Sequence, residues 1–244
     1  MIILDAFTFF NEYDLLEIRL NELDKYVDTF LICTATTTHS GLPNPYTINM
    51  EEERYKKFAH KTCVIQVVLP SVQNGDRWRL ENYQRNALFN QQTVVLFGNA
   101  DFVIVGDVDE IPQLGTWKVG SEGIFTGHSY YYHMNRQHPS FWNGSVILQA
   151  WRFISKYGPI SPQDARNFRD ILQPVGYGQH FSWLGDPQEK VKSFAHDELD
   201  KPNFKVDLNY HPADGKELTI LSVNNMVYPK YFVDNTDKFK HLVA

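Results

Sequence analysis

One stretch of the sequence constrains the fold more than any other. An apolar run over residues 102–105 is followed by three acids within four positions, Asp107, Asp109 and Glu110. The run has the length and composition of a strand that is buried in an α/β sheet. Because side chains alternate between the faces of a strand, a strand that continues past this point places Asp107 and Asp109 on one face. Pro112 is expected to end it, since proline cannot donate a ladder hydrogen bond.

The two aspartates of this stretch predict a metal site. Carboxylates placed together at the carboxyl end of a buried strand repel each other, and a divalent cation between them removes that repulsion. Open α/β sheets bind ligands beyond the carboxyl ends of their strands, and a metal held by two acids shares its remaining positions with waters and substrate phosphates. We therefore expect Asp107 and Asp109 to bind Mn²⁺ or Mg²⁺ beside a phosphate. The alternative is a solvated strand end that leads into a turn.

The composition limits the class of protein. The chain has 244 residues, of which 43% are hydrophobic, enough for a sizeable core. The formal net charge of -6 argues against a nucleic-acid partner, because nucleic-acid binders carry a basic face. Cys33 and Cys63 lie in apolar runs without disulfide or zinc spacing, so we expect two small buried side chains. No run approaches the length of a membrane span and no signal peptide is visible, which predicts a soluble, cytoplasmic protein.

The amino-terminal half alternates between strand and helix patterns. An Asn11-capped helix has its apolar stripe at 15–23, and the segment 93–97 fits either a helix or a strand. The other expected elements are strands at 2–9, 29–35 and 62–69 and helices at 51–59 and 76–90. This order implies a parallel sheet with right-handed crossovers.

Beyond Pro112 the pattern changes to strands rich in tyrosine and glycine. Strand-like runs cover 124–134, 145–153 and 176–185, which predicts an antiparallel or mixed extension beside the site. A short helix over 163–172 carries Arg166 and Arg169, and another helix is expected from 186 to 196. The tail after 202 is polar and irregular.

Four blocks resemble glycosyltransferase family 17. The blocks lie in the family's order between Asp5 and about Leu199, and they cover residues 5–24, 107–112, 180–185 and 193–198. The chain departs from the family pattern at 33–35, where an acid is usual, and at Gln179, where tryptophan is usual. The membrane anchor and stem of the animal members are missing, which favours a stand-alone bacterial or viral enzyme.

The resemblance implies a GT-A-like single domain over 1–244. Its Rossmann-like, mainly parallel sheet is flanked by helices, and a smaller antiparallel extension lies on the acceptor side. The expected parts are a nucleotide-sugar-binding half at about 1–112, an acceptor and catalytic half at about 113–200, and a carboxyl-terminal tail at 201–244. The resemblance also implies a UDP-sugar donor, most simply UDP-GlcNAc, a glycan acceptor, and inversion at the anomeric carbon. It implies no particular oligomeric state.

The resemblance and the chemistry together give a set of candidate residues. Breaking the anomeric bond leaves negative charge on a diphosphate, which a metal and arginines stabilise, and an inverting transfer needs a carboxylate base. The metal ligands would be Asp107 and Asp109, with His180 or His196 as a third. The donor contacts would be Asp107, Asp109, Arg79, Arg85 and Phe7, with Arg166 and Arg169 as further phosphate ligands. The base would be Glu198 or Asp170 first, with Glu110, Asp164 and Asp197 as the other candidates.

Two rival classes stay open. A metal-dependent phosphatase or nucleotidyltransferase could use the same acids, although Glu110-Ile111-Pro112 is not the expected Asp-x-Thr continuation and residues 7–10 are not a glycine-rich loop. A lectin-like or degenerate transferase that binds without turnover is the non-enzymatic rival. The departures at 33–35 and at Gln179 favour that rival, and the intact acid pair argues against it.

Overall fold

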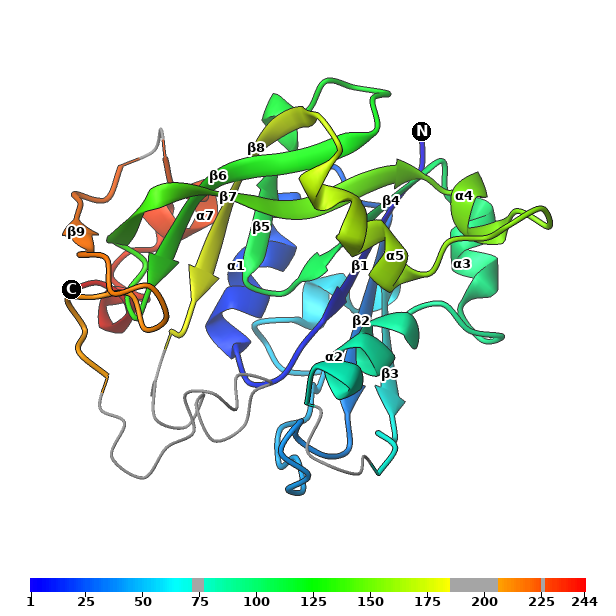
Figure 1. Ribbon diagram of the computed structural model, residues 1–244, viewed down its shortest axis with the longest axis horizontal. Helices are drawn as coiled ribbons and strands as arrows, with labels where there is room; N and C mark the ends of the chain where they lie inside the picture. The colour runs from blue at the N-terminus through cyan, green and yellow to red at the C-terminus, as the bar shows by residue number, and fades with distance from the viewer. Residues whose placement is uncertain (72–76, 185–205, 225–226) are drawn as a thin grey trace.

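The computed structural model describes residues 1–71, 77–184, 206–224 and 227–244, and its centre is one mixed sheet (Figure 1). The described strands follow the order β3-β2-β1-β4-β7-β6-β8-β5, and β9 pairs with β7. Their bounds are β1 Ile3–Thr8, β2 Thr29–Ala35, β3 Thr62–Val67, β4 Phe102–Asp107, β5 Glu110–Gln113, β6 Gly123–Tyr131, β7 Arg136–Gln149, β8 Pro174–Ser182 and β9 Thr219–Ile220.

The first four strands form the parallel half that the sequence predicts. β1 lies between β2 and β4 and is parallel to both, and β2 is parallel to β3. In this register Thr8 of β1 is level with Cys33 of β2 and with Asp107 of β4. The carboxyl ends of three strands therefore meet at one edge of the sheet, where α/β proteins bind their ligands.

Helices cover both faces of the parallel half. The α-helices are α1 Tyr13–Leu23, α2 Arg77–Asn86, α3 Val94–Asn99, α4 Trp151–Ile154, α5 Pro162–Asn167 and α7 Lys230–Asp234. On one face, an apolar cluster joins α1 to Ile3, Phe30 and Ile104 of the strands. On the other face, a second cluster joins α3, α4 and α5 to Leu4 of β1 and Val103 of β4. The alternation of side chains along buried strands produces these two layers.

The strands β5 to β8 form the antiparallel extension. β7 is antiparallel to β4 and to β6, β8 is parallel to β6, and β5 is antiparallel to β8. The extension is larger than expected, because β7 starts at Arg136 rather than at residue 145 and spans the sheet (Figure 1). The predicted strand over 145–153 ends at Gln149, and α4 follows it.

The acidic stretch is not the continuous strand that we expected. β4 ends at Asp107, residues 108–109 form a turn, and β5 begins at Glu110. Pro112 lies inside β5 and does not end a strand, because β5 is at the edge of the sheet where a missing N–H is tolerated. Asp107 and Asp109 are therefore placed by a turn and not by strand alternation.

Three smaller expectations also change. The predicted helix over 51–59 is a turn followed by a 3₁₀ helix, since its buried side chains Tyr55 and Phe58 are three residues apart and match the period of three. The segment 93–97 falls in α3, and α1 has Glu12 rather than Asn11 as its N-cap. The 3₁₀ helices are η1 Lys56–Lys61, η3 Leu114–Thr116, η4 Phe168–Asp170 and η6 Lys240–Leu242.

The carboxyl-terminal segment is part of the core. Tyr228, Phe232 and Phe239 are almost fully buried in a cluster with Leu15 and Ile18 of α1. The polar pattern after residue 202 conceals this, because the apolar residues are few and widely spaced. The helix expected from 186 to 196 lies outside the described residues, and no helix within the described ranges is long and apolar enough to cross a membrane.

Candidate active site

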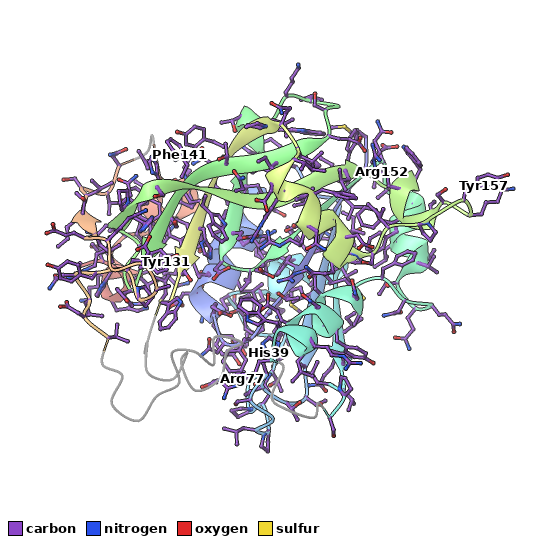
Figure 2. The ribbon with its side chains drawn as sticks, viewed as in Figure 1. His39, Arg77, Tyr131, Phe141, Arg152 and Tyr157 are labelled. Atoms are coloured by element: carbon purple, nitrogen blue, oxygen red, sulfur yellow. The ribbon has the colours of Figure 1, made fainter. Side chains whose placement is uncertain are left out.

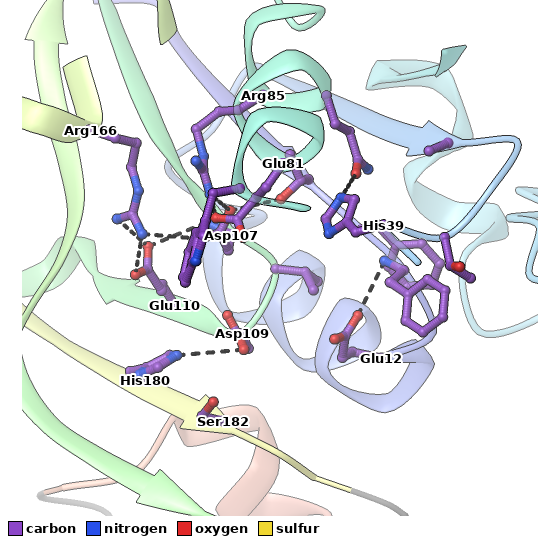
Figure 3. A pocket seen from close by; sticks show the side chains of 18 of the residues that line it. Glu12, His39, Glu81, Arg85, Asp107, Asp109, Glu110, Arg166, His180 and Ser182 are labelled. Atoms are coloured by element: carbon purple, nitrogen blue, oxygen red, sulfur yellow. Dashed lines mark hydrogen bonds and ion pairs between the residues drawn. The ribbon is translucent and has the colours of Figure 1, made fainter. Parts of the chain in front are cut away.

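A cavity of about 380 Å³ opens at the carboxyl ends of β1, β2 and β4 (Figure 3). Its described walls come from those strand ends, the loop after β2, α2, the acidic turn, β7, the region of α5 and η4, and β8. The charged residues that line it are Glu12, Glu81, Asp107, Asp109, Glu110, Arg85, Arg166 and Arg169. The parallel and antiparallel halves of the sheet thus contribute to one site.

A buried arginine fixes the backbone of the acidic turn. Arg19 of α1 pairs with Asp5 of β1 at 2.7 Å, and both side chains are fully buried. Its Nη1 donates to the carbonyl oxygen of Asp107 at 3.1 Å and also to that of Glu110. Buried charges are stable only when they are paired and hydrogen-bonded, so this interaction fixes the turn to the sheet. Ser145 Oγ donates to the Glu110 carbonyl at 3.1 Å.

The side chain of Asp107 is held by two arginines. Arg85 Nη2 lies 3.0 Å from Oδ1, and Arg166 Nη2 lies 3.1 Å from Oδ2. Thr8 Oγ1 donates to Oδ1 at 2.7 Å. Burial raises the pKa of Asp107, but the positive charges of Arg85 and Arg166 outweigh burial and hold this pKa well below its usual range. Asp107 is therefore a carboxylate throughout the physiological range.

Glu81 and Glu110 bind the other sides of the same two arginines. Glu81 Oε1 accepts from Arg85 Nη2 at 2.8 Å, and Glu110 accepts from both terminal nitrogens of Arg166 at 2.8 and 2.9 Å. The result is an alternating row of charges, Glu81–Arg85–Asp107–Arg166–Glu110, which we call the charge row (Figure 3). Each arginine in it lies between two carboxylates.

Asp109 is placed differently from the other aspartate. Its carbonyl oxygen accepts from Phe181 N at 2.8 Å, and its carboxylate lies 3.6 Å from His180 Nε2. His180 stacks on Trp142 with ring centroids 4.7 Å apart, and its Nδ1 is buried without a hydrogen-bond partner. Within the described part of the chain no donor binds the Asp109 carboxylate closer than this histidine. Asp109 is thus the acid of the turn with free acceptor capacity toward the cavity.

The donor set of the cavity fits a divalent cation at Asp109. Among the described lining residues, five carboxylates face three guanidinium groups, an excess of two acidic groups. Metal ligands at bond lengths of about 2.0 to 2.2 Å lie roughly 3 to 3.5 Å apart, close to the spacing of Asp109 and His180. Asp107 fits less well, because its oxygens already accept from Arg85 and Arg166.

Several predicted site residues lie away from the cavity. The ring of Phe7 is fully buried with the Arg19 guanidinium 4.4 Å from its centroid, so it cannot contact a ligand and that expectation is corrected. Arg79 and Asp170 are exposed and are not among the residues that line the cavity. Asp164 forms the capping box of α5 with Ser161. His196, Asp197 and Glu198 lie outside the described residues.

The loop after β2 contributes to the site, although its sequence did not predict this. His39 of this loop lines the cavity and is hydrogen-bonded to Gln84 of α2 at 2.9 Å (Figure 2). Burial lowers the pKa of His39, so the ring is neutral at physiological pH. Arg85 was expected as a donor contact, but Glu81 of the same helix was not predicted to belong to the site. The burial of Arg85 depends on contacts with α5 and β4, which no local pattern reveals.

A second group of possible metal ligands lies outside this cavity. His138, His211 and Asp214 bring one ligand atom each within 4.8 Å of the others. Ser140 N donates to His138 Nδ1 and Asp214 N donates to His211 Nδ1, at 3.2 and 3.0 Å. Asp214 also pairs with Lys216 at 3.3 Å. The group is therefore hydrogen-bonded without a metal.

The fold and the cavity define an α/β protein with a charged cavity at the carboxyl ends of its parallel strands. The chain belongs to glycosyltransferase family 17, whose family model matches residues 2–204. It is 31% identical to rat (Rattus norvegicus) β-1,4-mannosyl-glycoprotein 4-β-N-acetylglucosaminyltransferase over an alignment that covers 99% of this chain and 54% of the relative. The human enzyme of the same name is 31% identical over 45% of this chain and 22% of its own length. The chain therefore spans about half the length of the rat relative.

Proposed function

We propose that the protein is a metal-dependent, inverting glycosyltransferase of GT-A-like architecture. It moves a sugar, with GlcNAc from UDP-GlcNAc as the first donor to test, onto a hydroxyl of an acceptor glycan. The observation that supports this most strongly is the cavity beside Asp109, where arginines and an excess of acidic groups lie together at the strand ends. A diphosphate could not enter such an acidic cavity without a divalent cation to offset its charge.

Asp109 is the protein ligand that we propose for this cation, with His180 beside it. When bound, Mn²⁺ or Mg²⁺ supplies a Lewis acid that neutralises charge on the leaving diphosphate. Asp109 is suited to this role because its carboxylate lies 3.6 Å from His180 Nε2 and is bound by no arginine of the described chain. His196 remains a proposed third ligand.

The arginines of the cavity would bind the phosphates of the donor. Arg169 lies 4.9 Å from the ring centroid of Trp142, and no carboxylate of the described residues pairs with it. Burial lowers the pKa of Arg169, and the positive charge of Arg166 lowers it further. An unpaired, partly buried guanidinium gains most from an incoming anion, so Arg169 is a strong candidate for a direct phosphate contact.

The carboxylate base would come from the segment that follows β8. Inversion in a single displacement requires a group that takes the acceptor proton on the face opposite the leaving group. Glu110 is bound by Arg166 and Trp142, and Asp170 does not line the cavity. Asp164 caps α5, which leaves Asp197 and Glu198 among the candidates, and we propose Glu198 as the first to test. Glu198→Gln should abolish transfer while UDP binding persists.

The acceptor glycan would bind on the side of the cavity formed by β7 and β8. Trp142 and Trp183 line this side. Trp183 has a φ of 61°, a left-handed conformation that bulky residues rarely adopt and that costs about 1 to 3 kcal/mol. Strained backbone at a cavity wall is typical of residues that position a ligand.

The rival functions have less support. Of the departures at 33–35 and at Gln179 that favoured a binding module without turnover, only Ala35 lines the cavity. Cys33, Thr34 and Gln179 are buried away from it. Gln179 donates to the Val227 carbonyl oxygen instead. A nucleotidyltransferase or phosphatase would require a nucleophile or a phosphate loop beside Asp109, and Phe9 and Phe10 occupy the place of that loop.

The proposal is tested by a donor screen followed by a transfer assay. UDP-GlcNAc, UDP-Glc, UDP-Gal and GDP-mannose are each added with Mn²⁺ or with EDTA, and the thermal midpoint is measured, because ligands that bind the native state raise it. A Mn²⁺-dependent rise with UDP-sugars and transfer to a glycan with inverted configuration would support the proposal. A donor that binds but is never transferred would favour the binding module.

A further inference from the structure

We infer that Asp107 is a positioning residue that holds Arg85 and Arg166 for the donor diphosphate, and that the turn offers the metal a single aspartate, Asp109. This inference rests on the proposed function and assigns different roles to the two aspartates of one short motif. It follows from what each carboxylate already binds.

The Asp107 carboxylate has little capacity for a cation. Oδ1 accepts from Thr8 Oγ1 at 2.7 Å and from Arg85 Nη2 at 3.0 Å, and Oδ2 accepts from Arg85 and Arg166 at 3.1 Å each. A divalent ion on either oxygen would stand beside two guanidinium groups and be repelled by both. The Asp109 carboxylate, by contrast, forms an ion pair only with His180 among the described residues.

The two arginines depend on Asp107 for their mutual arrangement. Their Nη2 atoms both lie within 3.1 Å of the same oxygen, so Asp107 is the anion that offsets their repulsion. Because both Nη2 atoms contact this one oxygen, the two guanidinium groups are close enough to repel each other. Without Asp107 they would separate, and each would turn toward its remaining partner, Glu81 or Glu110.

The arrangement leaves donors for a phosphate. Both arginines line the cavity, and Arg85 Nε has no acceptor among the described residues. A guanidinium with an unsatisfied donor gains a hydrogen bond from an anion that reaches it, and its planar fork matches phosphate oxygens. Asp107 thus acts on the diphosphate only through the arginines that it holds.

The inference is tested by comparing Asp107→Asn with Asp109→Asn in three binding measurements. Calorimetry gives the affinity for UDP, the affinity for uridine, and the Mn²⁺ concentration that half-saturates UDP binding. Asp109→Asn should lose the stimulation of UDP binding by Mn²⁺. Asp107→Asn should keep the half-saturating Mn²⁺ concentration within about threefold of wild type and lose about tenfold in UDP affinity, with uridine affinity unchanged.

A double mutant and a substitute variant complete the test. Because Asp107 acts through the arginines, the loss of UDP affinity in Arg85→Gln with Asp107→Asn should be clearly smaller than the product of the two single losses. If Asp107→Asn does not fold, Arg85→Gln alone carries the test, since it should weaken UDP but not uridine and leave the half-saturating Mn²⁺ concentration unchanged. Any Asp107 or Arg85 variant that changes the Mn²⁺ requirement as Asp109→Asn does would overturn the inference. A wild-type protein that binds no UDP with Mn²⁺ would instead refute the proposed function.

Discussion

Asp5 and Arg19 form an ion pair at 2.7 Å whose two side chains are both fully buried. The pair links β1 to α1, and the guanidinium also binds the carbonyl oxygens of Asp107 and Glu110. One arginine thus connects the sheet, the first helix and the acidic turn. The position of Asp109, the proposed metal ligand in this turn, therefore depends on the contacts of Arg19.

Removing Arg19 should therefore damage stability and the site together. We expect Arg19→Met to lower the free energy of unfolding by about 3 to 5 kcal/mol, because it leaves the Asp5 carboxylate buried without a partner. Denaturant titration measures the change. Asp234→Asn is the matched control, since Lys230 and Asp234 form an exposed pair that should contribute less than about 1 kcal/mol. Equal losses in both variants would contradict the role assigned to Arg19.

Arg169→Gln should weaken donor binding without a comparable loss of stability. No carboxylate of the described residues pairs with Arg169, so its removal leaves no buried anion unpaired. A charge-assisted hydrogen bond contributes about 1.5 to 3 kcal/mol, which predicts a loss of roughly tenfold or more in UDP affinity. Calorimetry with UDP and with uridine separates the two effects, because uridine lacks the diphosphate. A loss that is equal for both ligands would place Arg169 at the base or ribose instead.

The stability conferred by Asp107 should depend on pH in the acid range. Burial raises its pKa, but Arg85 and Arg166 dominate and lower the pKa in the folded state below the ordinary value of about 3.9. A depressed pKa stabilises the fold at a pH above the unfolded value, and this contribution is lost as the pH falls toward the folded value. The stability difference between wild type and Asp107→Asn should therefore shrink from about pH 5 to pH 2. A difference that stays constant over this range would show that the carboxylate charge is not what holds the arginines.

Glu198→Gln separates the chemical step from binding. If Glu198 takes the acceptor proton, turnover should fall by about 10² to 10⁴ while UDP affinity changes little. Asp164→Asn is a control from the same set of acids, because Asp164 caps α5 and faces solvent. Its turnover should stay near that of wild type. Full activity of Glu198→Gln would exclude Glu198 as the base.

Local patterns predicted much of the parallel half of the fold. The strand over 29–35 matches β2 residue for residue, and the apolar run 102–105 lies inside β4. Both strands are buried on two faces, so composition and length alone identify them. The acidic turn could not be predicted in the same way. The contact that fixes this turn joins Arg19 to the carbonyl oxygen of Asp107, which lies 88 positions further along the chain.

The same limit explains what was missed in the site and in the tail. Arg85 and Arg166 were expected as phosphate ligands, but nothing in their own segments predicts that each is buried against a carboxylate from another element. Tyr228 and Phe232 follow a polar stretch, and only their packing on α1 shows that they belong to the core. Hydrophobic periodicity reports which residues share a face of one helix or strand, whereas the burial of these residues depends on contacts between elements.

The most direct test of the whole account is the affinity for UDP of wild type and Asp109→Asn, each with Mn²⁺ and with EDTA. We expect wild type to bind UDP far more tightly with Mn²⁺ than with EDTA. Asp109→Asn should bind equally weakly under both conditions and remain folded. A wild-type affinity that does not respond to Mn²⁺, or an Asp109→Asn variant that still responds to it, would contradict the metal-dependent donor site at the centre of this account.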